Sequence, residues 1–222
     1  MKTGLIACFL LLLLFTAPAA PRAATVTMNW TGTMAMMPKE VEGSAYVTYG
    51  GKVFIFGGFT HDTEQNGTFI YDPSADLWTQ GAVLPTARYY CAATEAGGKI
   101  YVLGGARFEG GSSQSLTVCE AYDPATNSWA VSQPLPVALR GHSAVTANGK
   151  IYVLGGKTGS AFNESVYEFD PGSNSWSAFS TAPFAAAYGG ASFSASENRI
   201  YYMGGITSDT PVPASYLGKA YA

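Results

Sequence analysis

The chain has 222 residues, a formal net charge of −3 and 12% charged side chains, while aromatic residues make up 14%. This aromatic content excludes a disordered chain, and the length suffices for one domain with a substantial core. A mildly acidic chain without a run of basic residues is a poor ligand for nucleic acids and anionic membranes. We therefore expect no nucleic-acid partner.

The N-terminus has the pattern of a secretory signal peptide. Lys2 precedes an apolar stretch, Leu5–Thr16, and small residues follow that stretch. The stretch is too short for a transmembrane helix, and no other segment of the sequence is apolar enough to span a bilayer. We expect residues 1–24 to be a signal peptide cleaved near Ala19 to Ala24. This predicts a secreted or periplasmic protein without a transmembrane anchor.

The rest of the chain carries an internal repeat. Four apolar or aromatic runs end in a double glycine, at Gly57-Gly58, Gly104-Gly105, Gly155-Gly156 and Gly204-Gly205, with intervals of 47, 51 and 49 residues. In phase with them, an aromatic-Asp-Pro turn leads to a tryptophan three times: Tyr71 to Trp78, Tyr122 to Trp129 and Phe169 to Trp176. A period of roughly fifty residues is typical of repeat architectures.

Each element of the repeat has a physical reason. A continuous apolar run is typical of a strand that is buried on both faces. A double glycine tolerates positive φ and lets another backbone approach closely. Asp-Pro starts a turn, because Asp favours its first position and Pro presets φ at the second. The repeat therefore predicts short β strands joined by turns, with the tryptophans between neighbouring sheets.

A third element follows each tryptophan. A Leu-Pro pair and an arginine occur at Leu84-Pro85 with Arg88 and at Leu135-Pro136 with Arg140, and in degraded form at Ala182-Pro183 with Tyr188. The diglycine, Tyr-Asp-Pro, Trp and Leu-Pro-Arg elements together resemble the kelch repeat over about residues 28–222. The resemblance implies an all-β fold, a kelch-type β-propeller in residues 25–222, with four blades' worth of antiparallel four-stranded sheets.

The repeat also predicts where the blades lie. We expect an orphan d strand at about 27–36, complete blades at about 44–80, 89–131 and 141–180, and an incomplete blade at 189–222. The N-terminal strand would complete the last blade, which would close the ring and hide the sheet edges. Four blades are fewer than kelch propellers usually have. Two interpretations therefore stay open: a small closed ring, or the N-terminal part of a larger propeller.

Two cysteines are predicted in one blade. Cys91 falls in strand a and Cys119 in strand c, with strand b between them. Two strand spacings separate their α-carbons by about 9.5 Å, whereas a disulfide tolerates about 7 Å. We expect two buried free thiols.

The resemblance implies a binding or interaction module for a protein or carbohydrate partner, because loops at one end of kelch propellers form binding surfaces. The candidate ligand-binding residues at the d–a connections are Arg88, Tyr89, Tyr90, Arg140, His142 and Tyr188, and those in the b–c loops are Phe59, His61, Arg107, Phe108 and Lys157. Arginine forks and aromatic rings suit carboxylate-bearing peptides or sugars.

Some candidates have a second interpretation. Arg88 and Arg140 could instead lock the blades through hydrogen bonds to backbone carbonyls. His142 could serve packing and hydrogen bonding, and His61 could belong to a solvated loop or to a weak ion site with Asp62 and Glu64.

The sequence offers little catalytic chemistry. With His61 and His142 as its two histidines, it shows no metal-ligand cluster, so we expect no metal, no cofactor and no enzyme activity. The alternative is a carbohydrate-active enzyme, similar to galactose oxidase or to sialic-acid epimerases, with its site partly outside this chain. The neighbours Tyr90 and Cys91 and the two histidines are residue types of the galactose oxidase copper site, but they form no matching motif.

Overall fold

A computed structural model describes residues 34–61, 63–209 and 220–221, which belong to one compact unit, Met34–Ala222. The expected signal peptide, and Trp30 with most of the expected strand at about 27–36, lie outside the described residues. Residues 34–36, the described end of that expected strand, are not in a strand. The predicted closure through Trp30 therefore stays a prediction.

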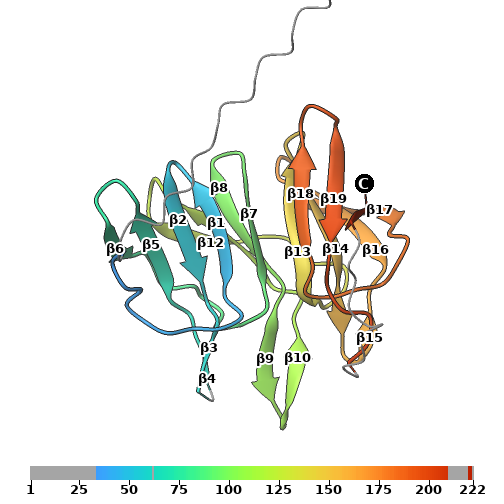
Figure 1. The fold of residues 1–222 in the computed structure, drawn as a ribbon, viewed down its shortest axis with the longest axis horizontal. Helices are drawn as coiled ribbons and strands as arrows, with labels where there is room; N and C mark the ends of the chain where they lie inside the picture. Colours follow the sequence, from blue (N-terminus) through green and yellow to red (C-terminus); the bar gives the residue numbers. More distant parts are fainter. Residues whose placement is uncertain (1–33, 62, 210–219, 222) are drawn as a thin grey trace, which may run out of the picture. The chain divides into compact units, whose positions relative to one another are not determined.

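The described strands pair antiparallel in four successive main sheets (Figure 1). The first has the order β1 (Ala45–Tyr49), β2 (Lys52–Phe56), β5 (Thr68–Asp72) and β6 (Leu77–Gln80). The second has the order β7 (Ala92–Ala96), β8 (Lys99–Leu103), β11 (Cys119–Asp123) and β12 (Ser128–Val131). The third has the order β13 (Arg140–Ala147), β14 (Lys150–Thr158), β16 (Ser165–Asp170) and β17 (Ser175–Thr181). In the fourth, the described strands are β18 (Gly190–Ser194), β19 (Arg199–Met203) and β20 (Ala220–Tyr221).

Short hairpins extend from the second strands of the first three sheets. They comprise β3 (Phe59–Thr60) with β4 (Thr63–Glu64), β9 (Ala106–Glu109) with β10 (Ser112–Ser115), and β15 (Ala161–Phe162), which pairs with β14. All three lie at the lower end of the sheets in Figure 1. We call this the loop end. The predicted all-β fold of antiparallel four-stranded sheets is confirmed.

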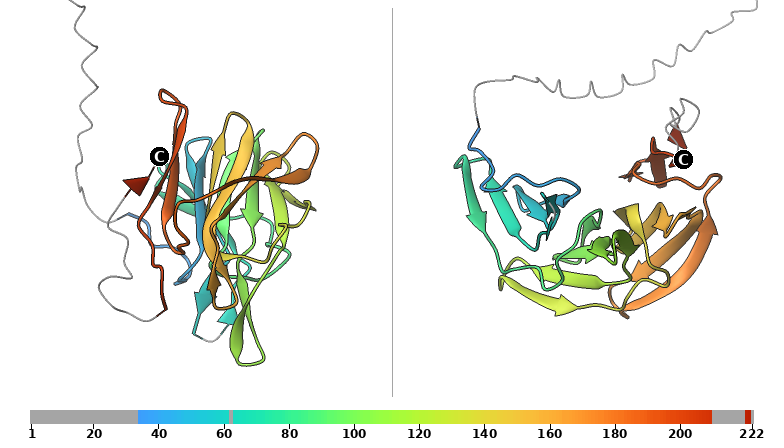
Figure 2. Two further views of the ribbon diagram at one scale, coloured as in Figure 1. Left: turned by 90° about the vertical axis from the view of Figure 1, so that its right-hand side faces the viewer. Right: turned by 90° about the horizontal axis from the view of Figure 1, so that it is seen from below.

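The apolar runs form the cores between successive sheets. Strands β1, β7, β13 and β18 contact one another in succession, and the sheets stand side by side around them (Figure 2). The run before the second diglycine is buried on both faces, since Ile100, Val102 and Leu103 have no exposed surface. Val102 and Ile100 pack with Phe56 of the first sheet, whereas Leu103 packs with Ile151 of the third. This double burial explains why the run does not alternate between polar and apolar residues.

A hydrogen-bond motif connects each complete sheet to the segment before it. The indole N–H of the repeat tryptophan donates to a backbone carbonyl at 2.9 Å: Trp78 to Ala35, Trp129 to Ala82 and Trp176 to Gln133. The N–H of each acceptor residue donates in return to a turn side chain: Asp76, Asn127 and Asn174. These three turn residues have φ of 49° or 50°, a region that Asp and Asn tolerate better than most residues. Ala35 thus makes the same contacts with the first sheet that Ala82 makes with the second.

The diglycines allow neighbouring sheets to approach closely. Gly104 has φ +52°, and a β-carbon there would lie 2.6 Å from the Leu139 carbonyl oxygen. The N–H of the next residue, Gly105, donates to the same carbonyl at 2.8 Å. A side chain at Gly104 would displace this inter-sheet hydrogen bond, which gives the diglycine the role predicted from its sequence.

Candidate functional site

The loop end brings together the candidates from the d–a connections and from the b–c hairpins. Phe59 and His61 lie in or beside β3, Arg107 and Phe108 in β9, and Lys157 near the end of β14. The first two hairpins touch, because the Phe108 N–H donates to the Glu64 carboxylate. The backbones of Tyr89 and Ala106 also pair, which ties the d–a connection to β9.

Arg88 lies inside the second sheet. Its side chain has no exposed surface and forms an ion pair with Glu120, whose side chain is 4% exposed. The guanidinium also donates to the carbonyls of Thr86 at 2.9 Å and Val102 at 3.0 Å. Of the two roles that the sequence leaves open for Arg88, this geometry fits the structural one. Glu120, which the sequence reasoning missed, satisfies the buried charge.

The other basic candidates also have local partners. Arg140 donates to the Ser115 hydroxyl at 2.8 Å and to the Gly159 carbonyl at 2.9 Å, so it joins β10 to the loop before β15. Lys157 is buried, pairs with Asp209 and lies 4.8 Å from the centroid of the Phe162 ring. Arg107 pairs with Glu109 at the surface, with 2.6 Å between Nη2 and Oε2.

Four aromatic rings form a continuous row at the loop end, which we call the aromatic row: Phe59, Tyr89, Tyr90 and Tyr188. The ring centroids of successive members lie 4.9, 5.0 and 5.2 Å apart. Tyr89 is buried and shares a 2.6 Å hydrogen bond with the Ser113 hydroxyl, whereas Tyr188 is 42% exposed. Burial, together with the charges of neighbouring groups, raises the pKa of Tyr90, so its hydroxyl stays protonated at neutral pH.

Two tyrosines of this row, Tyr90 and Tyr188, have an unusual backbone conformation for their residue type. Gly43, Tyr90, Gly141 and Tyr188 occupy equivalent positions, and all have φ between 52° and 62°. The N–H of each donates to the carbonyl of the one before it, at 2.6, 2.8 and 2.7 Å. Two bulky tyrosines therefore hold a conformation that strongly favours glycine. The spacing from the double glycines is the available signal for Tyr90, because Gly43, Tyr90 and Gly141 each lie fourteen residues before the first glycine of a pair, at Gly57, Gly104 and Gly155.

The two histidines lie in different settings. His61 is exposed and lines a pocket of about 300 Å³ with Glu40, Glu42 and Phe59. His142 is 6% exposed, and burial lowers its pKa to about 4, opposed in part by the backbone of Leu103. The hydrogen bond to the Leu103 backbone is a weak one, because neither ring nitrogen of His142 has a partner at good hydrogen-bond geometry among the described residues.

The described residues add little metal or thiol chemistry. Within them, no group of three or more His, Cys, Asp or Glu residues is arranged to hold a metal ion. Cys91 and Cys119 are buried free thiols, as predicted, and burial raises the pKa of Cys119 to about 12. The described part of the chain also has no helix with the length and apolar character that crossing a bilayer requires.

The successive antiparallel sheets, packed face to face with hairpins at one end, define a propeller-type β fold. The chain belongs to the kelch-repeat family, since residues 47–216 match the model of the KLHDC2/KLHL20/DRC7 Kelch-repeats domain. Kelch repeats indicate a protein-interaction module.

Curated relatives agree with this family, and a solved structure has a similar fold. The chain is 32% identical to Kelch-like protein 23 from Homo sapiens over 169 residues, which cover 72% of this chain and 29% of the relative. It is 29% identical to Kelch repeat and BTB domain-containing protein 8 from Danio rerio, over 69% of this chain and 26% of the relative. The chain thus spans less than a third of each relative. The solved structure titled "Structure of YjhT" has a similar fold, with a TM-score of 0.68 at 21% identity, covering 79% of this chain and 61% of that one.

Proposed function

We propose that this chain is an exported kelch-repeat module that binds a protein partner with its loop end and performs no chemistry of its own. The observation that carries the proposal is the aromatic row beside the β9–β10 hairpin, with Tyr188 42% and Phe108 53% exposed. Exposed aromatic rings on a fixed scaffold supply large contact areas at low entropic cost, and such residues dominate protein interfaces.

The ion pairs at the loop end favour a partner that packs on aromatic rings over a partner whose carboxylates bind to arginine side chains. Arg88 is committed to Glu120, Lys157 to Asp209 and Arg107 to Glu109. Arg140 already donates to β10 and to the loop before β15. A carboxylate-bearing ligand would have to break these contacts, so an apolar or aromatic segment of a partner protein fits this surface better.

Export is the second part of the proposal and rests on residues 1–24. Expression of the full chain in a secretion-competent host, followed by N-terminal sequencing of the exported product, tests it. We expect the new first residue to lie between positions 20 and 25. Retention of the intact chain inside the cell would contradict export without affecting the binding proposal.

Partner capture tests the binding part. The mature protein and its Phe108→Ala variant are immobilised and exposed to the exported fraction of the cells that make the protein. Val131→Ala is the matched control, because Val131 is 84% exposed on the outer strand β12, outside the hairpins. We expect a captured protein that the control retains and the Phe108→Ala variant loses. Equal capture by both variants would contradict binding through the β9–β10 hairpin.

A further inference from the structure

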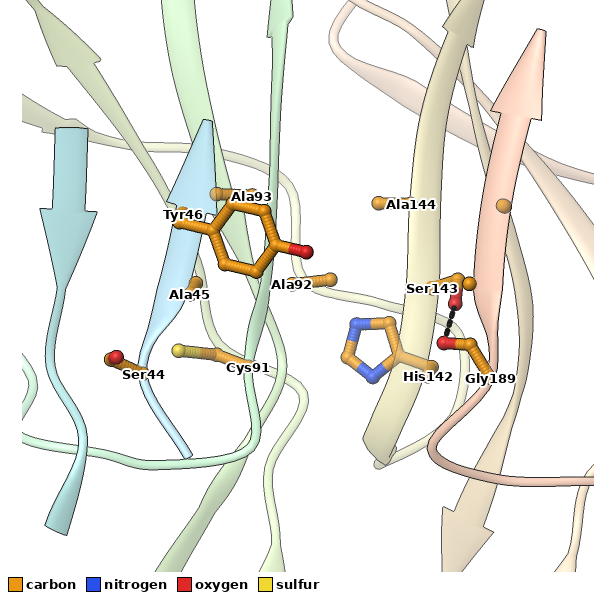
Figure 3. Close-up of a pocket in the computed structure, with 12 residues that line it drawn as sticks. Ser44, Ala45, Tyr46, Cys91, Ala92, Ala93, His142, Ser143, Ala144 and Gly189 are labelled. Atoms are coloured by element: carbon orange, nitrogen blue, oxygen red, sulfur yellow. Dashed lines mark hydrogen bonds between the residues drawn. The ribbon is translucent and has the colours of Figure 1, made fainter. Parts of the chain in front are cut away.

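A pocket lies among the inner strands, and none of the residues that line it belongs to the β9–β10 hairpin. It has a volume of about 270 Å³ (Figure 3). It is lined by the starts of β1, β7 and β18, each with the residue before the strand, and by His142, Ser143 and Ala144 within β13. An adjoining pocket of about 280 Å³ shares Ser44, Tyr46, Cys91, His142 and Gly189 with it. Tyr90 and Tyr188 line this second pocket, so the two cavities join the inner strands to the tyrosines at the loop end. We call the pair the inner pocket.

His142 is the polar group of the inner pocket that the fold leaves unsatisfied. Its ring projects from β13 toward β7, and the Tyr46 hydroxyl points into the same space from β1 (Figure 3). A neutral imidazole carries one donor and one acceptor, yet neither nitrogen has a partner at good hydrogen-bond geometry within the described part of the chain, and the Leu103 backbone is at most a weak one. Buried polar groups in folded proteins nearly always have a partner, which can be water or a ligand. Ser143, by contrast, is satisfied because it donates to the Gly189 carbonyl at 2.8 Å.

The inner pocket carries no charge. None of its lining residues is an acid, a lysine or an arginine. Burial lowers the pKa of His142 to about 4 and raises that of the Cys91 thiol, so both are neutral near pH 7.

The charges that act on the lining residues of the inner pocket come in pairs of opposite sign, Glu42 with Arg140 on Tyr90 and Glu120 with Arg88 on Cys91. A charged molecule would therefore lose hydration here without gaining a net counter-charge, which is unfavourable. The pocket therefore selects an uncharged ligand.

The backbone conformation at positions 90 and 188 does not require the tyrosines that line the inner pocket there. Gly43 and Gly141 hold the same conformation as Tyr90 and Tyr188, and they continue the same chain of hydrogen bonds. A glycine would satisfy the fold at position 188 without the strain of a left-handed tyrosine. Strained residues of this kind cluster at ligand sites, and the exposed ring of Tyr188 offers an apolar face at the mouth of the pocket.

We propose that the inner pocket binds an uncharged, hydroxyl-bearing ligand the size of one sugar ring, which packs on the Tyr188 ring and hydrogen-bonds to the His142 imidazole. Neutral monosaccharides have both features, since their hydroxyls donate and accept hydrogen bonds and their C–H faces pack on aromatic rings. This site goes beyond the proposed protein-binding function: it shares Tyr188 with the aromatic row, but it includes no residue of the β9–β10 hairpin.

The test uses the mature chain and defined probes. Saturation-transfer NMR measures binding of glucose, galactose and N-acetylglucosamine, with glucuronate and glucosamine as charged counterparts of similar size. We expect at least one neutral sugar to bind at millimolar concentration, and the charged sugars to bind about tenfold more weakly or not at all. Absence of binding by all the neutral sugars, or equal binding by the charged ones, would overturn the proposal.

Two variants test the residues. Tyr188→Gly removes the ring and keeps the backbone conformation, whereas His142→Phe fills the same space without ring nitrogens. Each is expected to weaken the neutral sugar by about tenfold, the effect of losing one good contact. Phe108→Ala is the control and should bind the sugar like the wild type. If His142→Phe fails to fold, Tyr188→Gly alone decides, and wild-type affinity in that variant would refute the site. Because Phe108→Ala tests the protein partner, the two proposals can fail separately.

Discussion

Removing Glu120 should strongly destabilise the second sheet. Its carboxylate is the ionic partner of Arg88, whose side chain has no exposed surface. In Glu120→Ala the guanidinium keeps its carbonyl acceptors at Thr86 and Val102 but loses its counter-charge in a water-excluded site. Breaking a buried pair in this way costs about 3–5 kcal/mol of the free energy of unfolding.

Urea unfolding followed by tryptophan fluorescence measures this loss, since Trp78, Trp129 and Trp176 join each sheet to the preceding segment. With a slope of about 2 kcal/mol per molar urea, the midpoint should fall by about 2 M. The slope itself should stay unchanged if unfolding remains cooperative.

Two comparisons distinguish the effect of burying this ion pair from the effect that any ion pair has on stability. Removal of the exposed Arg107–Glu109 pair, whose side chains are 51% and 59% exposed, should cost less than about 1 kcal/mol. The double variant Arg88→Met with Glu120→Leu should regain most of the loss, because two apolar side chains replace the pair without a buried charge. A loss below about 1 kcal/mol in Glu120→Ala would refute this reasoning. Arg88 would then be open to the ligand role that the sequence also allowed.

Three further predictions concern the backbone and the buried histidine. Asn127→Ala removes the acceptor of the Ala82 N–H and of the Tyr122 hydroxyl, and it strains the backbone at φ +50°. Thermal unfolding should therefore show a loss of about 2–3 kcal/mol in the free energy of unfolding. The variant Asn127→Gly should be about 1 kcal/mol more stable than Asn127→Ala, and equal stability would contradict the strain argument. Tyr188→Gly should be about 1 kcal/mol more stable than Tyr188→Ala, because both variants lose the ring but only glycine holds φ +62° without backbone strain. The reverse order of stability would contradict strain at this position. Burial holds the pKa of His142 at about 4 in the folded protein, below its usual value of about 6.5. As the pH falls, the unfolded chain therefore binds the proton before the folded one does. The folded state loses stability between pH 6.5 and pH 4 for this reason. Relative to His142→Phe, the wild type should lose about 3 kcal/mol over that range in urea titrations, and parallel pH profiles would exclude a buried neutral imidazole.

The repeat spacing predicted the features whose contacts lie within one blade or between neighbouring blades. The apolar run, the double glycine and the tryptophan each act within one sheet or against its neighbour, so their phase in the sequence places them in space. For the same reason Phe59, Tyr89, Tyr90 and Tyr188 were predicted at one end, where their rings form a row.

The parts that sequence reasoning missed depend on single residues that do not recur in the repeat. Glu120 pairs with Arg88 across 32 positions, and Asp209 pairs with Lys157 across 52, so no local pattern announces either contact. The left-handed conformation of Tyr90 and Tyr188 is also hidden, because a tyrosine at a loop normally indicates contact area and not strain. Glycines at the equivalent positions, Gly43 and Gly141, were the available signal.

The central claim is that the loop end is the surface that a partner protein contacts. Site-specific photo-crosslinking tests it directly: a photoreactive amino acid is placed at position 108 in β9 or at position 131 in β12, and the protein is irradiated in the cells that make it. Both positions are well exposed, so a partner protein could reach a photoreactive side chain at either one. We predict a discrete crosslinked partner from position 108 and none from position 131. The same partner from both positions, or from position 131 alone, would contradict binding through the loop end.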